Sequence, residues 1–533
     1  MIAVREAAGR DVPAIREIFL ACYGTDYSPQ YYDESQLTRL VYSESSLLLV
    51  AEDTEAGQVL GTASVDLEVG ALSDLVAEFG RLAVHPAARN RGLGNLLMVE
   101  RLKRVEHRVQ VALVETRMTH PYALKISQAH GFVPVGFLPM RWRVRQRESM
   151  MLLARYFTDA LQMRKNHPRI IPEIYPVAHE ALENCSIAPD AIVDEDAHPY
   201  PAGGSFELQE MTTEGYAPLL RIERGRVRHR EIFGPVRLHY GIFKLQSKRS
   251  TYLIAREQGR IVGAVGFTID YQDKAARIFE LISLNDDVIR ILLTDLDQAL
   301  KDRLGAPAEV VEIDVSAYAP RMQRTLLELG FLPVAYVPAL AFDEVERLDV
   351  VKMFRLPGPP QVNTDSLSPQ CKAMAELVLR RFRARDVLPR IAEAVGSLPL
   401  FAGLDVEQGV RLAGVCGTAS FEPGEALFRE GEADCRMHLV LEGEVAVSMR
   451  GAAKPVGVVR SGECLGEVSL LAAAPHSATA IAKTHVETAV ITHSDMSELI
   501  RLRPDIGIHI YRNLAIGTGE KLKRVDSLLA RAY

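Results

Sequence analysis

Short apolar runs alternate with stretches of helical periodicity over the first 145 residues. Strands are predicted at 2–5, 47–51, 59–69, 79–84, 111–116 and 132–142. Helices are predicted where apolar residues recur every three or four positions, at 11–19, 93–105 and 122–130. This order of strands and helices predicts a mixed α/β domain over residues 1–145.

A basic, glycine-containing turn follows the predicted strand at 79–84. It reads Arg89-Asn90-Arg91-Gly92-Leu93-Gly94-Asn95, and the next helix begins within it. The first N–H groups of a helix have no acceptor inside the helix, and the helix dipole is positive there. Gly92 and Gly94 let a bulky anion approach the backbone, so the turn predicts a phosphate site. It is no Walker loop, because Gly-Lys-Ser/Thr is absent, and no Rossmann fingerprint, because the third glycine is missing.

The order R-x-x-G-x-G directly after Leu-Ala-Val-His-Pro resembles the acetyl-CoA signature of the GCN5-related N-acetyltransferases. Arg89, Gly92 and Gly94 occupy its defining positions. The resemblance covers residues 1–145 and implies acetyl-CoA as a substrate. It implies that the pantetheine arm pairs with the backbone of Leu82, Ala83 and Val84, and that the pyrophosphate is held by Arg89, Asn90, Arg91, Gly92, Leu93, Gly94 and Asn95.

Acetyl transfer requires a neutral amine, whereas a free lysine amine has a pKa of about 10.4. A base must therefore take a proton, and in many members of this family it is a glutamate on the strand before the turn. Glu78 lies eleven residues before Arg89 and matches that place. Strand alternation predicts Glu78, Gly80, Leu82 and Val84 on one face. The alternative is that Glu78 is a solvated glutamate at a strand end.

A second stretch resembles the same family at Ala123, Gly131 and Phe132. Ser127 stands where a tyrosine often protonates the leaving thiolate, and His120 replaces an asparagine. Ser127 acting with a water is therefore the candidate general acid. Unassisted departure of the thiolate is the alternative, because a thiol pKa of about 8–9 makes it a tolerable leaving group.

Residues 146–204 are predicted to form a helical connector, with helices at 150–163 and 178–185. The chain then repeats itself, because the segment Gly131-Phe132-Val133-Pro134 returns as Gly330-Phe331-Leu332-Pro333, offset by 199 residues. A predicted hairpin around Gln258-Gly259, a strand at 310–315 and a helix at 321–329 accompany the second copy.

Residues 205–356 thus resemble a second, degenerate acetyltransferase domain. The glycine turn is absent from this copy, and Asp286 and Asp287 stand in its place. Two carboxylates would repel a pyrophosphate, so we expect this copy to be non-catalytic. We expect it to pack against the first copy and to help shape the substrate cleft.

Residues 357–396 are predicted to be a proline-rich linker followed by a helix. From 397 to 533 short apolar runs are separated by glycines, and this pattern resembles the β-roll of cyclic nucleotide-binding domains. Its ligand cassette would contain Gly466, Glu467, Val468, His476 and Ser477. Glu467 matches the glutamate that accepts a hydrogen bond from the ribose, whereas His476 replaces the arginine that clamps the cyclic phosphate. Weakened binding, a different ligand and no ligand all remain open.

Composition narrows the class of protein. The chain has 533 residues and a net charge of −7, so no basic field points to nucleic acid as a partner. No apolar run is long enough to span a membrane, and the charged N-terminus is unlike a signal peptide. Six scattered cysteines without a C-x-x-C pair argue against a zinc ribbon or a disulfide framework and fit the reducing cytoplasm.

The predicted architecture is two α/β (α+β) acetyltransferase folds in tandem followed by a β-roll. This combination resembles the bacterial protein lysine acetyltransferases that are controlled by cyclic AMP. The resemblance implies an acetyl-CoA-dependent N-acetyltransferase, acting on a protein lysine and regulated by a cyclic nucleotide. One alternative acylates a small-molecule amine or uses a longer acyl donor. The other is a non-catalytic nucleotide-sensing scaffold.

Overall fold

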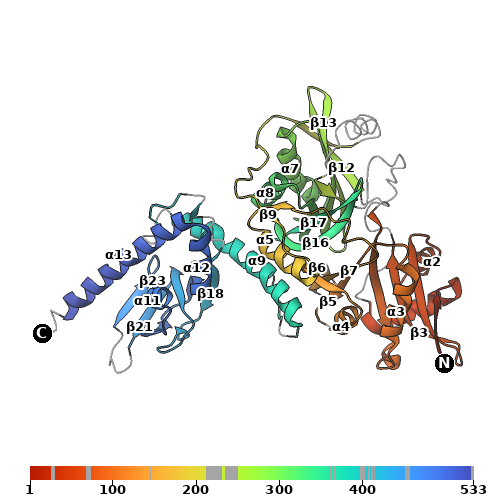
Figure 1. Cartoon of the computed structure of the whole chain (residues 1–533), viewed down its shortest axis with the longest axis horizontal. Helices are drawn as coiled ribbons and strands as arrows, with labels where there is room; N and C mark the ends of the chain where they lie inside the picture. Colours follow the sequence, from red (N-terminus) through yellow and green to blue (C-terminus); the bar gives the residue numbers. More distant parts are fainter. Residues whose placement is uncertain are drawn as a thin grey trace. The chain divides into compact units, whose positions relative to one another are not determined.

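The alternating elements of the N-terminal region build the first half of a large mixed sheet (Figure 1). In the computed structural model these elements are β1 (Ile2–Glu6), α1 (Val12–Tyr23), α2 (Glu34–Val41), β2 (Ser46–Asp53), β3 (Gln58–Asp66), β4 (Val76–Val84), α3 (Leu93–Val105), β5 (Val111–Arg117), α4 (Tyr122–Ala129), β6 (Val133–Arg143) and β7 (Arg147–Tyr156). The structure describes all residues except 26–30, 68–73, 120, 144–145, 212–230, 235–249, 359, 361, 365, 396–401, 406–407, 410–411, 413–414, 450–455 and 530–533. The six predicted strands and three predicted helices of this region are confirmed, with ends shifted by a few residues.

Strands β4 and β5 are the parallel pair of this half, and they diverge after three paired positions. Their pairing runs from Val76 opposite Val111 to Glu78 opposite Leu113. β4 continues to Val84 beyond the last of these pairs. The neighbouring pairs β3–β4 and β5–β7 are antiparallel, and α3 packs on β2, β3 and β4. The divergence exposes one edge of β4 next to the start of α3.

The helix expected at 150–163 is wrong. This stretch begins inside β7, which lies between β5 and β6 in the sheet. Six consecutive residues of β7 are buried, because both faces of the sheet are covered here. An unbroken apolar run of this length does not distinguish a strand from a buried helix. The rest of the connector contains β8 (Arg169–Ile170), α5 (Tyr175–Asn184) and β9 (Ile192–Val193), and α5 is the second helix expected there.

The second half of the sheet repeats the pairing order of the first. Its elements are β10 (Glu207–Glu210), β11 (Ile232–Phe233), β12 (Ser250–Glu257), β13 (Arg260–Asp270), β14 (Ala275–Ser283), α7 (Asp287–Leu304), β15 (Val310–Ser316), α8 (Pro320–Glu328), β16 (Leu332–Asp343) and β17 (Glu346–Arg355). From the outside inward, the first half pairs as β2-β3-β4-β5-β7-β6 and the second as β12-β13-β14-β15-β17-β16. Among the described residues the two halves form one 15-stranded sheet.

The halves join where β6 pairs with β16, antiparallel, at Gly136 opposite Ala335. These two residues are separated by 199 positions, the offset of the sequence repeat. A Cβ atom at Gly136 would come within 2.0 Å of the Ala335 Cβ, so glycine is needed for the approach. Helix α5 packs on both strands of this junction.

Each half has a hairpin that one arginine anchors to the other half. Arg147 anchors the β6–β7 hairpin, and Arg347 anchors the β16–β17 hairpin. Arg347 donates to the Asp74 carbonyl at 2.8 Å and to the Gln110 Oε1 at 2.6 Å. Arg147 donates to the Asp273 carbonyl and, at 2.7 Å, to the Glu309 carboxylate. Asp273 and Glu309 lie 199 positions after Asp74 and Gln110, so the two anchors are equivalent. The contacts are reciprocal, as they are across a two-fold axis.

The C-terminal region is a separate unit made of Gly358–Pro360 and Leu379–Tyr533. Its elements are β18 (Gly417–Phe421), β19 (Ala426–Phe428), β20 (Arg436–Glu442), β21 (Glu444–Ser448), β22 (Gly457–Arg460), β23 (Cys464–Leu465), α11 (Glu467–Ala472), β24 (Thr479–Ala482), β25 (Val486–Thr492), α12 (His493–Leu502) and α13 (Pro504–Leu529). Two four-stranded sheets, β18-β25-β20-β23 and β19-β24-β21-β22, form the expected β-roll. Glycines with positive φ stand at its corners, at Gly424, Gly431, Gly443, Gly462 and Gly466. The preceding helix α9 (Pro369–Val395) begins in the first unit and continues into this one.

Candidate active site

The turn between β4 and α3 has the geometry expected of an anion site. Gly92 precedes α3 with φ of 74°, a left-handed conformation that a side chain would strain. Among the described residues no side chain caps this helix, and nothing lies within 4 Å of where a Gly92 Cβ would be. Arg89 and Arg91 are exposed beside the turn, and Arg91 lies 3.6 Å from Asp53. The turn is therefore open, basic and backbone-rich.

Strand β4 carries a bulge just before this turn. Gly80 pairs with Ser64 and Ala83 with Thr62, so two residues of β4 oppose one of β3. Arg81 has φ of 52°, and its guanidinium binds Asp66 at 2.7 Å. The expectation that Glu78, Gly80, Leu82 and Val84 share one face is therefore wrong beyond Gly80, because the bulge changes the alternation. The backbone of Leu82, Ala83 and Val84 lies beyond the last β4–β5 pair, on the edge of β4 that this divergence opens.

Glu78 is the last residue of β4 that pairs with β5, and its side chain is only partly exposed. Burial, and after it the neighbouring carboxylates of Glu115 and Asp66, raise the pKa of Glu78 to about 7. Arg141 and Arg81 act in the opposite direction on this pKa. A carboxylate with a pKa near neutrality combines adequate basicity with a useful ionised fraction, which a general base needs.

A small cavity of about 30 Å³ lies beside Glu78 and has room for about one water. It is lined by residues of both halves: Glu78, Leu113, Glu115, Leu138, Arg141, Leu152, Arg277, Glu312, Lys352 and Phe354. We call its charged members, together with Asp314, the Glu78 cluster. In this cluster Arg141 lies 3.4 Å from Glu115 and 3.6 Å from Glu312, and Lys352 lies 2.9 Å from Asp314.

Of the Glu78 cluster, only Glu78 itself is predicted from the sequence as a site residue. The family resemblance gives no role to Arg141, Arg277, Glu312 or Lys352. The signal in the sequence is a single charge within an apolar strand, as at Lys352 in Val-Val-Lys-Met-Phe and Arg277 in Ala-Ala-Arg-Ile-Phe. Such a charge is stable in a strand only when a partner meets it, but the sequence does not say which partner.

The structure does not favour Ser127 as a general acid. Ser127 is 1% exposed, and its hydroxyl donates to the Ala123 carbonyl at 2.9 Å within α4. This bond is the usual local bond of a serine in a helix. The proton that a leaving thiolate would need is thus held by the helix backbone. His120 lies outside the described residues.

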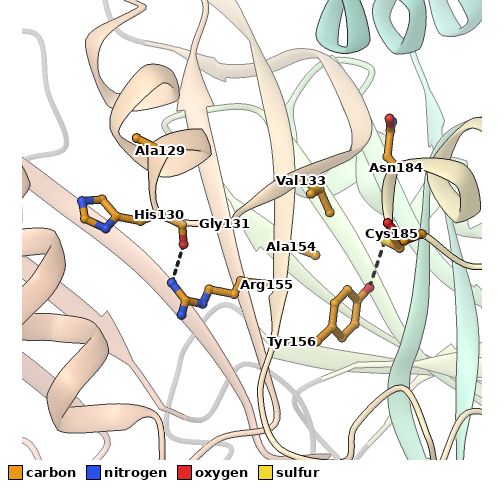
Figure 2. Close-up of a pocket in the computed structure, with 10 residues that line it drawn as sticks. Ala129, His130, Gly131, Val133, Ala154, Arg155, Tyr156, Asn184 and Cys185 are labelled. Atoms are coloured by element: carbon orange, nitrogen blue, oxygen red, sulfur yellow. Dashed lines mark hydrogen bonds between the residues drawn. The ribbon is translucent and has the colours of Figure 1, made fainter.

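A larger, open pocket of about 530 Å³ lies elsewhere, between the ends of α4 and α5 (Figure 2). Its lining includes Arg155, which donates to the His130 carbonyl, and Cys185, whose Sγ is 3.9 Å from the Tyr156 hydroxyl. Burial raises the pKa of Cys185 to about 12, so this thiol is not a nucleophile at neutral pH. None of the expected acetyl-CoA or catalytic residues lines this pocket.

The cassette of the β-roll contains a buried histidine. The His476 ring is 2% exposed and stacks on Phe428, with ring centroids 3.8 Å apart. Its Nε2 lies 2.6 Å from Asp434 and its Nδ1 lies 3.1 Å from the Ser469 hydroxyl. Both ring nitrogens are therefore engaged by the protein itself.

The other expected cassette residues surround this histidine. Gly466 has φ of 80° and begins α11, where Glu467 is buried and Val468 is exposed. Ser477 is exposed next to His476. Position 476, where the family has an arginine, thus holds a buried imidazole that contacts the Asp434 carboxylate.

Within the described residues no cluster of three or more histidine, cysteine or acidic side chains could hold a metal ion. No helix in the described part of the chain is long and apolar enough to cross a bilayer.

Comparison with known families agrees with this geometry. Residues 12–132 match the model of the Acetyltransferase (GNAT) family, and residues 418–503 match that of the cyclic nucleotide-binding domain. The cAMP-dependent protein kinase regulatory subunit of Yarrowia lipolytica is 32% identical over 103 residues, which are 19% of this chain and 28% of that protein. The regulatory subunit of Eremothecium gossypii is 34% identical over 107 residues, 20% of this chain and 22% of that protein. The chain thus spans about a quarter of the length of these two curated relatives.

Solved structures of both kinds are similar to parts of the chain. A phosphinothricin acetyltransferase of Sinorhizobium meliloti in complex with AcCoA is 19% identical, covers 30% of this chain and 89% of that chain, and has a TM-score of 0.26. A cyclic nucleotide-binding domain from Methylobacillus flagellatus is 22% identical, covers 28% of this chain and 85% of that chain, and has a TM-score of 0.26. A GNAT domain implies acetyl-CoA, and a cyclic nucleotide-binding domain is compatible with a cyclic nucleotide as ligand. The chain carries a GNAT acetyltransferase domain near its N-terminus and a cyclic nucleotide-binding domain near its C-terminus.

Proposed function

We propose that this protein transfers the acetyl group of acetyl-CoA to a protein lysine under the control of its nucleotide-binding domain. The observation that carries the proposal is Glu78, a partly exposed carboxyl with a pKa near 7, at the point where β4 leaves β5. The open α3 N-terminus lies at the far end of the same strand. Base and anion site are thus positioned by one strand.

The residues of the turn fit an anionic ligand, because Gly92 leaves open space and no side chain among the described residues caps α3. Arg89, Asn90 and Arg91 would hold the pyrophosphate with the N–H groups of the helix start. The backbone of Leu82 to Val84 would orient the pantetheine arm. Acetyl-CoA supplies the thioester carbonyl that the amine attacks.

Glu78 takes the proton of the substrate ammonium, directly or through a water. The neutral amine then attacks the thioester carbonyl. A C–N bond forms, the C–S bond breaks, the thiolate leaves with the sulfur electron pair, and the nitrogen releases its remaining excess proton to solvent to give the neutral amide. Because the Ser127 proton is bound to the Ala123 carbonyl, we assign the protonation of the thiolate to solvent. A thiol pKa of about 8–9 is compatible with this departure.

The second half is proposed to be a degenerate copy of the GNAT fold that does not bind acetyl-CoA. Its repeated strand order and its equivalent arginine anchors support this proposal. At the start of α7 the Asn285 side chain accepts from the Val288 N–H at 3.3 Å, and Asp286 pairs with Arg321 at 2.8 Å. Acidic side chains thus occupy the place of the glycine turn.

The test uses the full chain and acetyl-CoA labelled on the acetyl group. The protein is incubated with unacetylated lysine-containing proteins, and separately with a panel of polyamines and amino acids, with and without cyclic AMP. Mass spectrometry locates the label. Label on lysine side chains supports the proposal, and label confined to small amines contradicts the proposed acceptor. If neither set is labelled although acetyl-CoA binds, the proposed enzyme activity is wrong, and the alternative of a non-catalytic scaffold is favoured.

A further inference from the structure

The Glu78 cluster combines four carboxylates with three cations. The carboxylates are Glu78, Glu115, Glu312 and Asp314, and the cations are Arg141, Arg277 and Lys352. The six members other than Glu78 form five ion pairs with one another. Among the described residues, Glu78 is the carboxylate of the cluster without an ion-pair partner. The charge of this site is therefore set by residues from both halves of the sheet.

Arg141 is the cation that the first half contributes to the Glu78 cluster, and it is shared between two carboxylates. Its guanidinium lies 3.4 Å from Glu115 in β5 and 3.6 Å from Glu312 in β15 of the second half. The side chains of Glu115 and Glu312 are 15% and 12% exposed, so water screens these pairs only weakly. Glu312 thereby draws on a positive charge that would otherwise be available to Glu78.

Arg277 occupies the position in β14 that Glu78 occupies in β4, 199 residues earlier. It donates to Asp314 at 3.0 Å and lies 3.8 Å from Glu312. A glutamate at position 277 would leave five carboxylates to share two cations around one small cavity. The exchange of an acid for a base at this equivalent position neutralises the carboxylates of the second half.

We propose that Glu312 and Arg277, both on the second half, are positioning residues that set how readily Glu78 accepts a proton. Glu312 acts by holding Arg141, and Arg277 acts by neutralising Glu312 and Asp314. The inference rests on the proposed role of Glu78 as the base. It gives the second half a part in the chemistry of the first, which packing alone does not.

Charged side chains on strands of both halves lie around Glu78, whereas β7 contributes the apolar Leu152 to the cavity. The charged side chains are Asp66 on β3, Arg81 on β4, Glu115 on β5, Arg141 on β6, Arg277 on β14, Glu312 and Asp314 on β15 and Lys352 on β17. Asp66 is bound by Arg81 at 2.7 Å, and Asp314 is bound by Lys352 at 2.9 Å. Changes at Glu312 and Arg277 therefore act on Glu78 mainly through Arg141 and through the net charge of the cavity.

Substitutions at Glu312 and Arg277 are expected to shift the pH dependence of kcat/KM in opposite directions. In Glu312→Gln the Arg141 guanidinium loses one of its two carboxylates and stabilises ionised Glu78, so the acidic limb of kcat/KM moves to lower pH. In Arg277→Gln the cavity loses a cation, so the same limb moves to higher pH. Each shift is expected to be roughly half to one pH unit. A purely structural role would lower the active fraction and leave the midpoint of the limb in place.

Two control variants accompany these measurements on the full-length protein. Arg277→Lys keeps the charge and should return the limb towards wild type. Glu328→Gln removes a second-half carboxylate that binds Arg290 and does not line the cavity, so its limb should be unchanged. Shifts in the same direction, or no shift at either position, overturn the proposal.

An infrared titration separates this inference from the proposed enzyme activity. Difference spectra of protein labelled with 13C-glutamate, wild type minus Glu78→Gln, report the Glu78 carboxyl without any substrate. If wild type transfers no acetyl group, the proposed function fails, and the spectra still decide whether Glu312→Gln and Arg277→Gln move the Glu78 titration in opposite directions. If activity is present and the Glu78 titration stays fixed in both variants, this inference alone fails.

Discussion

At the scale of the residue, the proton affinity of one carboxyl is decided by groups that are distant in sequence. Glu78 was singled out by its spacing before Arg89, and in the structure it is the last residue of β4 that pairs with β5. Its raised pKa could not be predicted, because burial, Glu115 and Asp66 act on it only once the sheet has formed. A local pattern identifies a residue type, whereas its environment comes from tertiary contacts.

Glu78→Gln removes the base while keeping the size of the side chain. We expect kcat/KM to fall by roughly 10²–10⁴-fold, because this is the usual contribution of a positioned base. In wild type the rate should rise with pH through about 7 and then level off, because Glu78 must lose its proton to act. Steady-state kinetics from pH 5.5 to 8.5 measure both effects. A variant that keeps the same acidic limb would show that another group is the base.

Stability should depend on the same carboxyl. The pKa of Glu78 is raised above its unfolded value, so the folded state binds more protons than the unfolded state between about pH 4.5 and 7. Wild type therefore loses stability as pH rises through that window, whereas Glu78→Gln does not. We expect the variant to have the higher Tm at pH 8 and the two proteins to have equal Tm values near pH 4.5. Calorimetry at both pH values checks the sign, and a lower Tm for the variant at pH 8 contradicts it.

His476 gives a second prediction at this scale. Its ring is buried against Phe428 and bound to Asp434, so no fixed cation meets a cyclic phosphate at this position. We expect His476→Arg to bind cyclic AMP at least about tenfold more tightly than wild type, because a guanidinium makes charge-assisted, bidentate bonds to phosphate. Isothermal titration of the full chain with cyclic AMP measures this, and Ser477→Ala controls for general change in the cassette. Equal or weaker binding by His476→Arg would contradict this prediction.

At the scale of the element, predictions from sequence succeed where a local signal marks the boundary. The strand–turn–helix around Gly92 was predicted because glycines and a helical period follow a short apolar run. The region at 150–163 was predicted as a helix although its first part belongs to β7, since a strand buried on both faces has no alternation to recognise. The bulge at Arg81 also left no sequence signal, because Arg81 is not a glycine although its φ is positive.

Gly92 and Gly57 offer a matched pair of substitutions for testing the turn. Both have positive φ, of 74° and 63°, and neither has atoms within 4 Å of an added Cβ. Alanine at either position should cost stability to a similar extent, roughly 1 kcal/mol. Only Gly92→Ala should also raise the KM for acetyl-CoA, by several-fold, because it distorts the start of α3. Equal KM values for the two variants would exclude the turn as the pyrophosphate site.

At the scale of the whole first unit, one sheet unites two halves that are related like the subunits of a symmetric dimer. Gly136 and Ala335, equivalent in the sequence repeat, pair with each other, and Arg147 and Arg347 make equivalent contacts across the junction. Self-pairing of equivalent residues is the property of a two-fold interface. The repeat was visible in the sequence, but the continuous sheet was not, because nothing in a strand pattern specifies its neighbour.

The contribution of this junction to stability can be tested by adding a methyl group at Gly136 and then removing the one at Ala335. Gly136→Ala places a Cβ at 2.0 Å from the Ala335 Cβ and should destabilise the sheet by about 1–3 kcal/mol. In a domain of this size that corresponds to a fall in Tm of roughly 2–10 °C. Adding Ala335→Gly removes the clashing methyl and should recover part of the loss, since the Cα at position 335 still lies 2.7 Å from the new Cβ. Gly203→Ala, which has nothing within 4 Å, is the control and should leave Tm unchanged.

Because the Glu78 cluster draws its charges from both halves, Gly136→Ala should also displace the acidic limb of the pH–rate profile, and adding Ala335→Gly should bring the limb back. A double variant no more stable than Gly136→Ala would mean that this contact does not hold the halves together.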